Sequence, residues 1–438
     1  MSKPVIGFAG MTHLGINSAA AAAGRGFDTV CFDADAAGIA RLKSGTLPVV
    51  EPGLPELLEQ NKSRITYTAD GADLKRCGVV YIAADVPTDD QGQSDLSSIR
   101  ALIDTVAAGL GREAILVILC QVPPGFTRSL ALPKERLYYQ VETLIFGRAV
   151  ERAMHPERFI VGCAEPDRPI PQAMHAFLSA FSCPILPMRY ESAELAKISI
   201  NCCLVASVTV ANTLAELSER IGADWSEIIP ALKLDKRIGP HAYLAPGLGL
   251  AGGNLERDLA TILRFSEATG SEAGLVESFM QNSRHRRDWA LRTLHEQVLV
   301  ENSKAVIGVL GLAYKENTHS TKNSPSLALL ARLAPWRVRV HDPVVPASAA
   351  AHPDVTGCVS ALEVAKGSDA LVIMTPWPVF RDLKPDQLAR AMAGRAVIDP
   401  YRVLDGKAVA AAGLDYFTLG VPPIRASHNT PLPSKGRG

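Results

Sequence analysis

The sequence lacks several features that would place it in a common functional class. It has no excess of either charge, because 45 Lys and Arg balance 45 Asp and Glu, so no overall field favours nucleic acid or a membrane surface. Its eight cysteines show no CxxC or Cys/His ligand spacing, and a chain of this length needs no disulfide framework. No signal-peptide pattern opens the chain, and no apolar run approaches the roughly twenty residues of a membrane span. We therefore expect a cytoplasmic protein with reduced thiols and no metal, nucleic-acid or membrane partner.

What is present suits a large globular protein. The hydrophobic content of 47% over 438 residues is ample for the cores of roughly two to four domains. Largely apolar stretches at 79–87 and 114–125 are typical of strands buried on both faces of a parallel sheet.

The amino-terminal segment has the pattern of a dinucleotide-binding unit. Residues 4–9 predict a short buried strand, followed by the turn GMTHLG, an alanine-rich helix and a second strand that ends at Asp33. Gly10 and Gly15 hold the outer positions of GxGxxG, Thr12 replaces the middle glycine, and Leu14 lies in the same turn. Alone, this turn is equally compatible with an ordinary tight turn. Asp33 favours a cofactor, and it favours NAD over NADP because a carboxylate binds the ribose hydroxyls and repels a 2′-phosphate.

A second glycine-rich stretch, APGLGLAGGNLERD, runs from Ala245 to Asp258. Its four glycines, which include Gly249 and Gly252, allow a backbone to approach a ligand closely. We expect the following helix to begin at about Asp258.

This stretch resembles the loop of the UDP-glucose/GDP-mannose 6-dehydrogenases, PGFGFGGSCLPKD, whose cysteine is the covalent nucleophile. Asp258 matches the family's aspartate, Arg257 takes the lysine position, and Asn254 stands where the cysteine belongs. The segments ADAAGIARLKSGTLPVVEPGLPELL and HPERFIVG are also similar to the family, and the resemblance extends over about residues 4–420.

The resemblance implies an α/β fold with two Rossmann-like doubly wound domains joined by a central helical region with a long helix. The implied domains are an NAD-binding domain at 1–190, a helical dimerisation domain at 191–300 and a nucleotide-sugar-binding domain at 301–420. The segment 421–438 is rich in Pro, Ser and Gly, which predicts a disordered tail.

Several catalytic positions of the family differ in this chain. CQVPPGFT at 120–127 resembles STVPVGTT, with Gln121 where a threonine positions the catalytic water, and QVETLIFGRA resembles NPEFLREGRA, with Glu142 kept and Phe146 in place of a second glutamate. Lys197 and Asn201 match the pair that contacts the reacting sugar. They lie four residues apart in a predicted helix of about thirty residues and hence on one face, although a solvated lysine beside a satisfied asparagine is the alternative.

Other positions concern cofactor and substrate. Thr88 matches a family position beside the cofactor, or is an ordinary loop threonine. Arg237, in DKRIG, matches an arginine that reaches the nucleotide diphosphate across a dimer interface, which implies a homodimer. Lys315 takes the place of a lysine in the carboxyl-terminal domain, and Lys322 replaces an arginine and so lacks its bidentate fork. With Gly249 and Gly252, these residues are the candidate substrate contacts.

The family oxidises the sugar C6 alcohol to an acid in two hydride transfers, with a thioester on the cysteine. An asparagine amide is no such nucleophile, whereas Asp258, Lys197 and Glu142 still suffice to remove the proton of a hydroxyl. Cys120 is the one plausible substitute thiol.

Three hypotheses follow for a nucleotide-linked sugar or nucleoside substrate. The protein performs a single NAD-dependent oxidation or a reversible oxidation with epimerisation; it is a full 6-dehydrogenase with an unusual acyl route; or it is a non-catalytic homologue that binds NAD and a nucleotide sugar.

Overall fold

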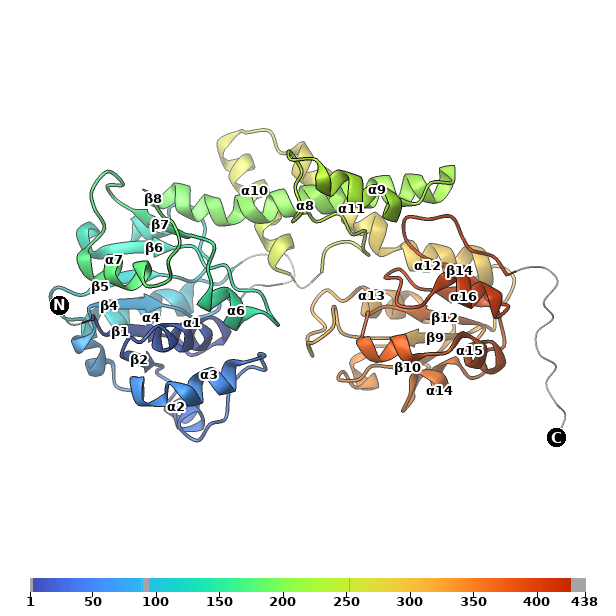
Figure 1. Ribbon diagram of the computed structural model, residues 1–438, viewed down its shortest axis with the longest axis horizontal. Coiled ribbons are helices and arrows are strands. Elements are labelled where there is room, and N and C mark those ends of the chain that lie inside the picture. Colours follow the sequence, from blue (N-terminus) through green and yellow to red (C-terminus); the bar gives the residue numbers. More distant parts are fainter. Residues whose placement is uncertain (1–2, 88, 90–93, 252, 427–438) are drawn as a thin grey trace. The chain divides into compact units, whose positions relative to one another are not determined.

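The computed structural model describes residues 3–87, 89, 94–251 and 253–426. The chain divides into two compact units, Met1–Ile200 and Asn201–Gly438, and Figure 1 traces the first in blue to green and the second in green to red. The long helix α8 (Tyr190–Ile221) includes the point of division. Two predicted positions, Thr88 and Gly252, lie outside the described residues.

The first unit is built on an eight-stranded sheet in the order β3-β2-β1-β4-β5-β6-β7-β8. All neighbouring pairs are parallel except β6 and β7. The order 3-2-1-4-5-6 is that of a dinucleotide-binding fold, which binds ligands outside the carboxyl ends of the strands. The strands are β1 (Ile6–Ala9), β2 (Thr29–Phe32), β3 (Ile65–Thr68), β4 (Val79–Ile82), β5 (Ile115–Ile118), β6 (Leu137–Gln140), β7 (Phe159–Cys163) and β8 (Ile185–Arg189).

The strands β1, β2, β4 and β5 are buried at every residue, as the apolar runs predicted. The helices that cover this sheet are α1 (His13–Gly24), α2 (Ala36–Lys43), α3 (Leu54–Gln60), α4 (Ser97–Gly109), α5 (Phe126–Ser129), α6 (Ala149–Met154) and α7 (Gln172–Ser179). In α1 the alanines 19–23 are at most 2% exposed, because small side chains let the helix pack closely on the sheet.

The second unit contains a six-stranded, wholly parallel sheet in the order β11-β10-β9-β12-β13-β14. Its strands are β9 (Val306–Leu310), β10 (Arg337–His341), β11 (Val355–Gly357), β12 (Ala370–Ile373), β13 (Ala396–Ile398) and β14 (Asp415–Phe417). Its helices after α8 are α9 (Trp225–Leu234), α10 (Asn254–Thr269), α11 (Gly274–Arg287), α12 (Trp289–Leu294), α13 (Pro325–Arg332), α14 (Ala361–Ala365), α15 (Pro385–Ala391) and α16 (Gly406–Ala411). The two doubly wound sheets and the long central helix are those that the sequence predicted.

Two sequence predictions need correction. The helix α10 begins at Asn254 and not near Asp258, because Gly253 takes a left-handed conformation with φ 91° and acts as the N-cap. The structured chain also extends past the predicted start of the tail, since Ile424 forms an antiparallel bridge with Tyr416.

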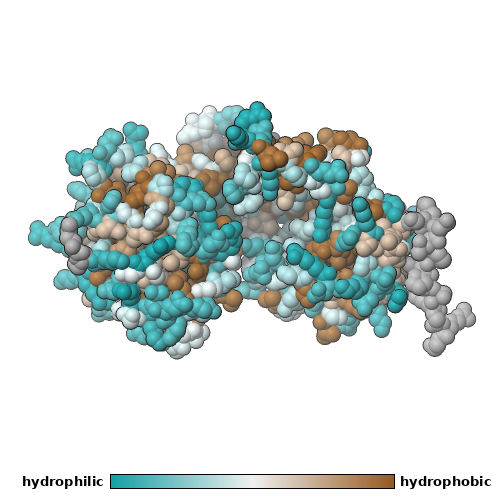
Figure 2. All heavy atoms as spheres, viewed as in Figure 1, coloured by the Kyte–Doolittle hydropathy of each residue, from teal (hydrophilic) through white to brown (hydrophobic). Residues whose placement is uncertain are grey.

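The prediction that no segment is apolar enough to span a membrane was too simple for α8. Its most apolar 18-residue window has a mean hydropathy of 1.6, and α8 is the one helix of the described chain that is long and apolar enough to cross a membrane. Core helices of soluble proteins share these properties, so this is weak evidence for a membrane span. Only 28% of the window is buried, and in Figure 2 other apolar patches are scattered among hydrophilic side chains.

Candidate active site

The turn between β1 and α1 requires glycine at both predicted positions. Gly10 has φ 95°, and a Cβ atom on it would lie 2.6 Å from Cβ of Ala84; a Cβ on Gly15 would lie 1.8 Å from the carbonyl oxygen of Gly10. The helix therefore starts directly after the strand, at the end of the fold where a dinucleotide places its phosphates. Leu14 is only 5% exposed, so its backbone and not its side chain faces the outside of this turn.

Thr12 takes part in a contact that the motif did not predict. Its hydroxyl accepts a hydrogen bond from the backbone N–H of Asp85 at 2.9 Å, and the Asp85 carboxylate accepts one from the backbone N–H of His13 at 3.2 Å. Two hydrogen bonds therefore join the turn before α1 to the segment that follows β4.

Asp33 follows β2 directly, at the predicted end of the second strand. One carboxylate oxygen accepts the N–H of Met11 at 2.8 Å and the other accepts the N–H of Asp35 at 2.9 Å. A hollow beside it is lined by Met11, Asp33, Asp35, Gly38, Arg41, Leu42, Thr46, Leu47 and Pro48. A hollow with a carboxylate at its edge, beside the turn that begins α1, fits the adenosine end of NAD.

Glu142 and Lys197 meet although 55 residues separate them. Glu142 follows β6, Lys197 lies in the second turn of α8, and their carboxylate and ammonium are 2.7 Å apart. The side chains are 17% and 12% exposed, so the pair is partly shielded from water. The other oxygen of Glu142 accepts the N–H of Leu144 at 3.0 Å. Gln121, half-buried, follows β5.

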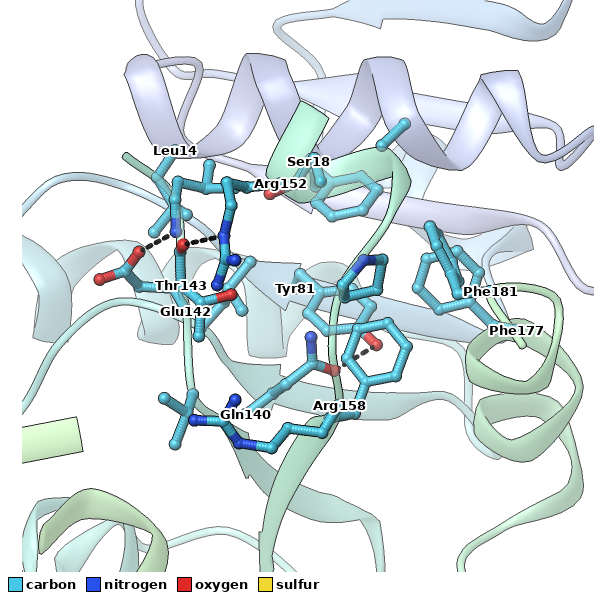
Figure 3. Close-up of a pocket in the computed structure, with 18 residues that line it drawn as sticks. Leu14, Ser18, Tyr81, Gln140, Glu142, Thr143, Arg152, Arg158, Phe177 and Phe181 are labelled. Atoms are coloured by element: carbon cyan, nitrogen blue, oxygen red, sulfur yellow. Dashed lines mark hydrogen bonds between the residues drawn. The ribbon is translucent and has the colours of Figure 1, made fainter. Parts of the chain in front are cut away.

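A cavity lined by Glu142 and by several aromatic side chains lies in the first unit (Figure 3). Leu14, Tyr81, Phe177 and Phe181 contribute to its wall, and the hydroxyl of Tyr81 donates to Gln140 Oε1 at 3.2 Å. In Figure 3 Glu142 lies across the cavity from Phe177 and Phe181. We therefore interpret the cavity as part of the packing that supports β6 and the segment carrying Glu142.

Sequence reasoning missed a buried cluster under the same segment. His13 Nε2 lies 3.0 Å from Glu51 Oε2, and Glu51 also accepts the N–H groups of Gly147 and Ala149 at 3.1 and 2.7 Å. Phe146 stacks on the His13 ring with 3.9 Å between centroids. Glu51 lies in the segment 34–58 that resembles the family, but nothing local indicates that its side chain is buried and needs distant donors.

In the second unit Asn201 and Asp258 come together. The Asn201 amide donates to Asp258 Oδ2 at 2.5 Å, and Arg257 Nε donates to Oδ1 at 3.2 Å. Asp258 is 2% exposed, and a buried carboxylate needs such partners. Lys197 and Asn201 are one turn apart in α8 and project from the same side of that helix.

The start of α10 lies beside the segment that carries Lys322. A Cβ on Gly253 would lie 3.0 Å from Cε of Lys322, and the Asn323 amide donates to Glu256 Oε2 at 2.5 Å. Asn254, the first residue of α10, is exposed. The structure thus brings Asn254 and Lys322 into one neighbourhood.

Three further residues were predicted to contact the substrate: Gly249, Lys315 and Arg237. Gly249 has φ 77° and a Cβ on it would lie 2.4 Å from the carbonyl oxygen of Ser283, so a close backbone approach requires this glycine. Lys315, half-buried, has its ammonium 5.6 Å from the Tyr314 ring centroid. The Arg237 side chain is 89% exposed and pairs with Asp235.

The thiols do not supply a replacement nucleophile. All eight cysteines are free. Cys120 is fully buried, and burial raises its pKa to about 12, so the thiol stays protonated at neutral pH. Cys202 and Cys203 follow Asn201 in α8 and point about 100° and about 200° away from it around the helix.

Comparisons with known proteins identify the family of the chain. Three family models match the chain: the NAD binding domain of the UDP-glucose/GDP-mannose dehydrogenase family at residues 5–178, its central domain at 191–284 and its UDP binding domain at 308–406. The chain is 28% identical to UDP-glucose 6-dehydrogenase TuaD of Bacillus subtilis, covering 95% of this chain and 93% of that protein. It is 29% identical to the UDP-glucose 6-dehydrogenase of Pseudomonas aeruginosa, covering 96% and 97%.

Solved structures are similar over nearly the whole chain. A UDP-glucose dehydrogenase from Pyrobaculum islandicum superimposes with a TM-score of 0.80 at 26% identity, covering 91% of this chain and 94% of that chain. A UDP-D-ManNAc dehydrogenase from Pyrococcus horikoshii gives a TM-score of 0.81 at 25% identity, covering 95% and 99%.

Proposed function

The chain belongs to the UDP-glucose/GDP-mannose dehydrogenase family and is an NAD-dependent nucleotide-sugar dehydrogenase by that membership, and from this premise we propose that it stops short of the acid. It performs one two-electron oxidation of a UDP-linked sugar, or a reversible oxidation with epimerisation. The observation that carries the proposal is Asn254, exposed at the first position of α10, where the resemblance places the nucleophilic cysteine.

The retained residues support the first oxidation. NAD, when bound, supplies the two-electron acceptor. The hydroxyl proton needs a base, and Asp258 offers a carboxylate whose position is fixed by Asn201 and Arg257. The Lys197 ammonium, held by Glu142 at 2.7 Å, offers positive charge to the alkoxide that forms as the proton leaves. Loss of the proton and transfer of the hydride leave a carbonyl on the sugar.

The residues for the second oxidation are missing. An aldehyde must add a nucleophile before it loses a second hydride, and the nucleophile must leave again on hydrolysis. The Asn254 amide does neither, Gln121 replaces the residue that positions the water, and Phe146 replaces a glutamate. We infer that the carbonyl product is released or reduced again.

The substrate is a UDP-sugar in this proposal. The similarity to a UDP binding domain and the names of the relatives favour uridine. Lys322, whose stem lies against Gly253, supplies a cation next to the proposed reacting carbon, and Lys315 and Arg237 are proposed contacts to the diphosphate.

The test follows NADH and product together. Incubated with NAD and UDP-glucose or UDP-N-acetyl sugars, the wild-type protein should give at most one NADH per sugar and no uronic acid by mass spectrometry. The variant N254C should restore the second oxidation, with two NADH per sugar and a carboxylate product, whereas the matched control N254S should not. Two NADH per sugar from the wild type would overturn the proposal. NAD and UDP-sugar binding without any turnover or exchange of label would instead identify a non-catalytic homologue.

The proposed assembly is a cytoplasmic homodimer formed along α8. Val210, Leu214, Leu217 and Ile221 are 53%, 39%, 50% and 66% exposed, and their spacing of four, three and four residues places them on one stripe of the helix. A stripe of this kind is expected to be covered by a second copy, which would also bring the partner's copy of Arg237 toward the site as the resemblance implies.

A further inference from the structure

The first amide of α1 is already used by an acidic side chain. The Asp85 carboxylate accepts the N–H of His13 at 3.2 Å, and its own N–H donates to the Thr12 hydroxyl at 2.9 Å. Thr12 is the N-cap residue of α1 but makes no side-chain cap hydrogen bond itself. Asp85, from the end of β4, therefore caps the helix in its place.

This is also the position at which a dinucleotide places its pyrophosphate. The helix start at the carboxyl ends of β1 and β4 is the anion-binding end of the fold, and the glycines at positions 10 and 15 leave no side chain in the way. A bound pyrophosphate would therefore lie next to the Asp85 carboxylate, which already accepts the first N–H of α1. Two anions so close disfavour the ionised form of the carboxyl group.

The other groups around Asp85 do not remove this conflict. His13, on α1, lowers the pKa of Asp85 through its charge, but its Nε2 pairs with the buried Glu51 at 3.0 Å, and the net shift of the Asp85 pKa is still upward. Glu142, from the segment after β6, adds a negative charge that Lys197 pairs at 2.7 Å. Cys120, after β5, is a neutral thiol because burial raises its pKa. The Thr12 hydroxyl carries no charge.

We propose that Asp85 takes up one proton when NAD binds, so that pH sets the affinity of this protein for its cofactor.

The unliganded protein already favours this step. Desolvation, chiefly, and the charge of Glu142 raise the pKa of Asp85 above its ordinary value of 3.8, while the hydrogen bonds with Thr12 and His13 and the charge of His13 oppose the change. NAD raises this pKa further. Between the free and the bound pKa, the complex carries a proton that the free protein lacks. Affinity therefore falls by about tenfold per pH unit as pH rises through that window, and is independent of pH below it.

The experiment is calorimetric titration of the full-length protein with NAD between pH 5.5 and 8.5, in pairs of buffers that differ in ionisation enthalpy. For the wild type we expect a Kd that rises with pH and an uptake approaching one proton per NAD. D85N keeps an acceptor for the His13 N–H but has no charge, so it should bind NAD more tightly at pH 8.5, with no pH dependence and no proton uptake. D104N, an exposed carboxylate on α4, is the matched control and should behave as wild type.

The possible outcomes distinguish the role of Asp85 from the assignment of NAD as the cofactor, on which that role rests. A wild-type Kd that is flat with pH, or a D85N variant that keeps the wild-type pH slope, would overturn the role of Asp85 while leaving NAD as the cofactor. The second result would assign the proton to another group, such as His13. If neither protein bound NAD at any pH, the cofactor assignment itself would fall, and the inference with it.

Discussion

Asp33 illustrates how one side chain combines a structural and a recognition role. Its carboxylate receives two backbone N–H groups, from Met11 and Asp35, which fix it at the edge of the hollow beside the turn. In that position a negative charge favours ribose hydroxyls and opposes a 2′-phosphate. Arg41 lines the same hollow and lies 3.3 Å from Asp35, so a cation for a phosphate is already present.

The variant D33N should therefore shift cofactor preference toward NADP. Loss of a charged acceptor for the ribose should weaken NAD binding by roughly 10- to 160-fold, since hydrogen bonds to charged groups contribute about 1.5–3 kcal/mol. Removal of the repulsion should let NADP bind through Arg41. Titration calorimetry with both dinucleotides measures the shift, and the double variant D33N/R41A should lose the gain in NADP affinity. If D33N binds NADP no better than the wild type does, Asp33 is not what excludes the 2′-phosphate.

At the scale of elements, the sequence predicted best where the information is local. The strand, turn and helix that begin the chain and the long helix through Lys197 and Asn201 follow from apolar runs, a glycine turn and helical spacing. The second αβ region was implied by the resemblance to the family. The start of α10 was predicted too late because the four glycines suggest a long loop. In the structure the loop ends at Gly253, whose positive φ precedes the first helical residue, Asn254.

The contacts around the candidate site join residues far apart in the sequence, so the spacing of residues along the chain could not predict them. Lys197 meets Glu142 only because β6 and α8 are neighbours in the first unit. Glu51 meets Gly147 and Ala149 from almost a hundred residues away. Asp85 reaches α1 because β4 lies next to β1 in the sheet. A sequence shows that an acid is present, but sheet order decides which backbone amides it binds.

The segment that carries Glu142 should depend on Glu51 for its position. In E51Q, one carboxylate oxygen that accepts hydrogen bonds is replaced by an NH₂ group that faces other donors. Such an unsatisfied buried contact costs about 1–3 kcal/mol. We expect a lower urea midpoint of unfolding for E51Q and no change for E113Q, an exposed glutamate outside any described helix or strand. Equal midpoints for E51Q and wild type would show that the amide satisfies this cluster as well as the carboxylate does.

At the scale of the whole molecule, all three family models match in order along one chain. Differences from the family therefore concern particular residues and not a missing domain. In the proposed function, Asn254, Gln121 and Phe146 remove the second oxidation, while Gly10, Gly15, Asp258 and Lys197 keep the framework of the first. The division into three functional domains stays a prediction.

The apolar stripe of α8 gives a prediction for the assembly. A single apolar stripe on a long helix is stabilised when two copies bury it against each other, so L214D/L217D should place unpaired charges in the interface and convert a dimer to a monomer. Size-exclusion chromatography with light scattering measures the mass. V359D, which alters an apolar residue 89% exposed in the second unit and outside α8, should remain dimeric. The monomeric variant should also lose affinity for UDP-sugars, to the same extent as R237A, if Arg237 acts across the interface. A wild-type protein that is monomeric at micromolar concentration would contradict the dimer, and the stripe would then need another partner.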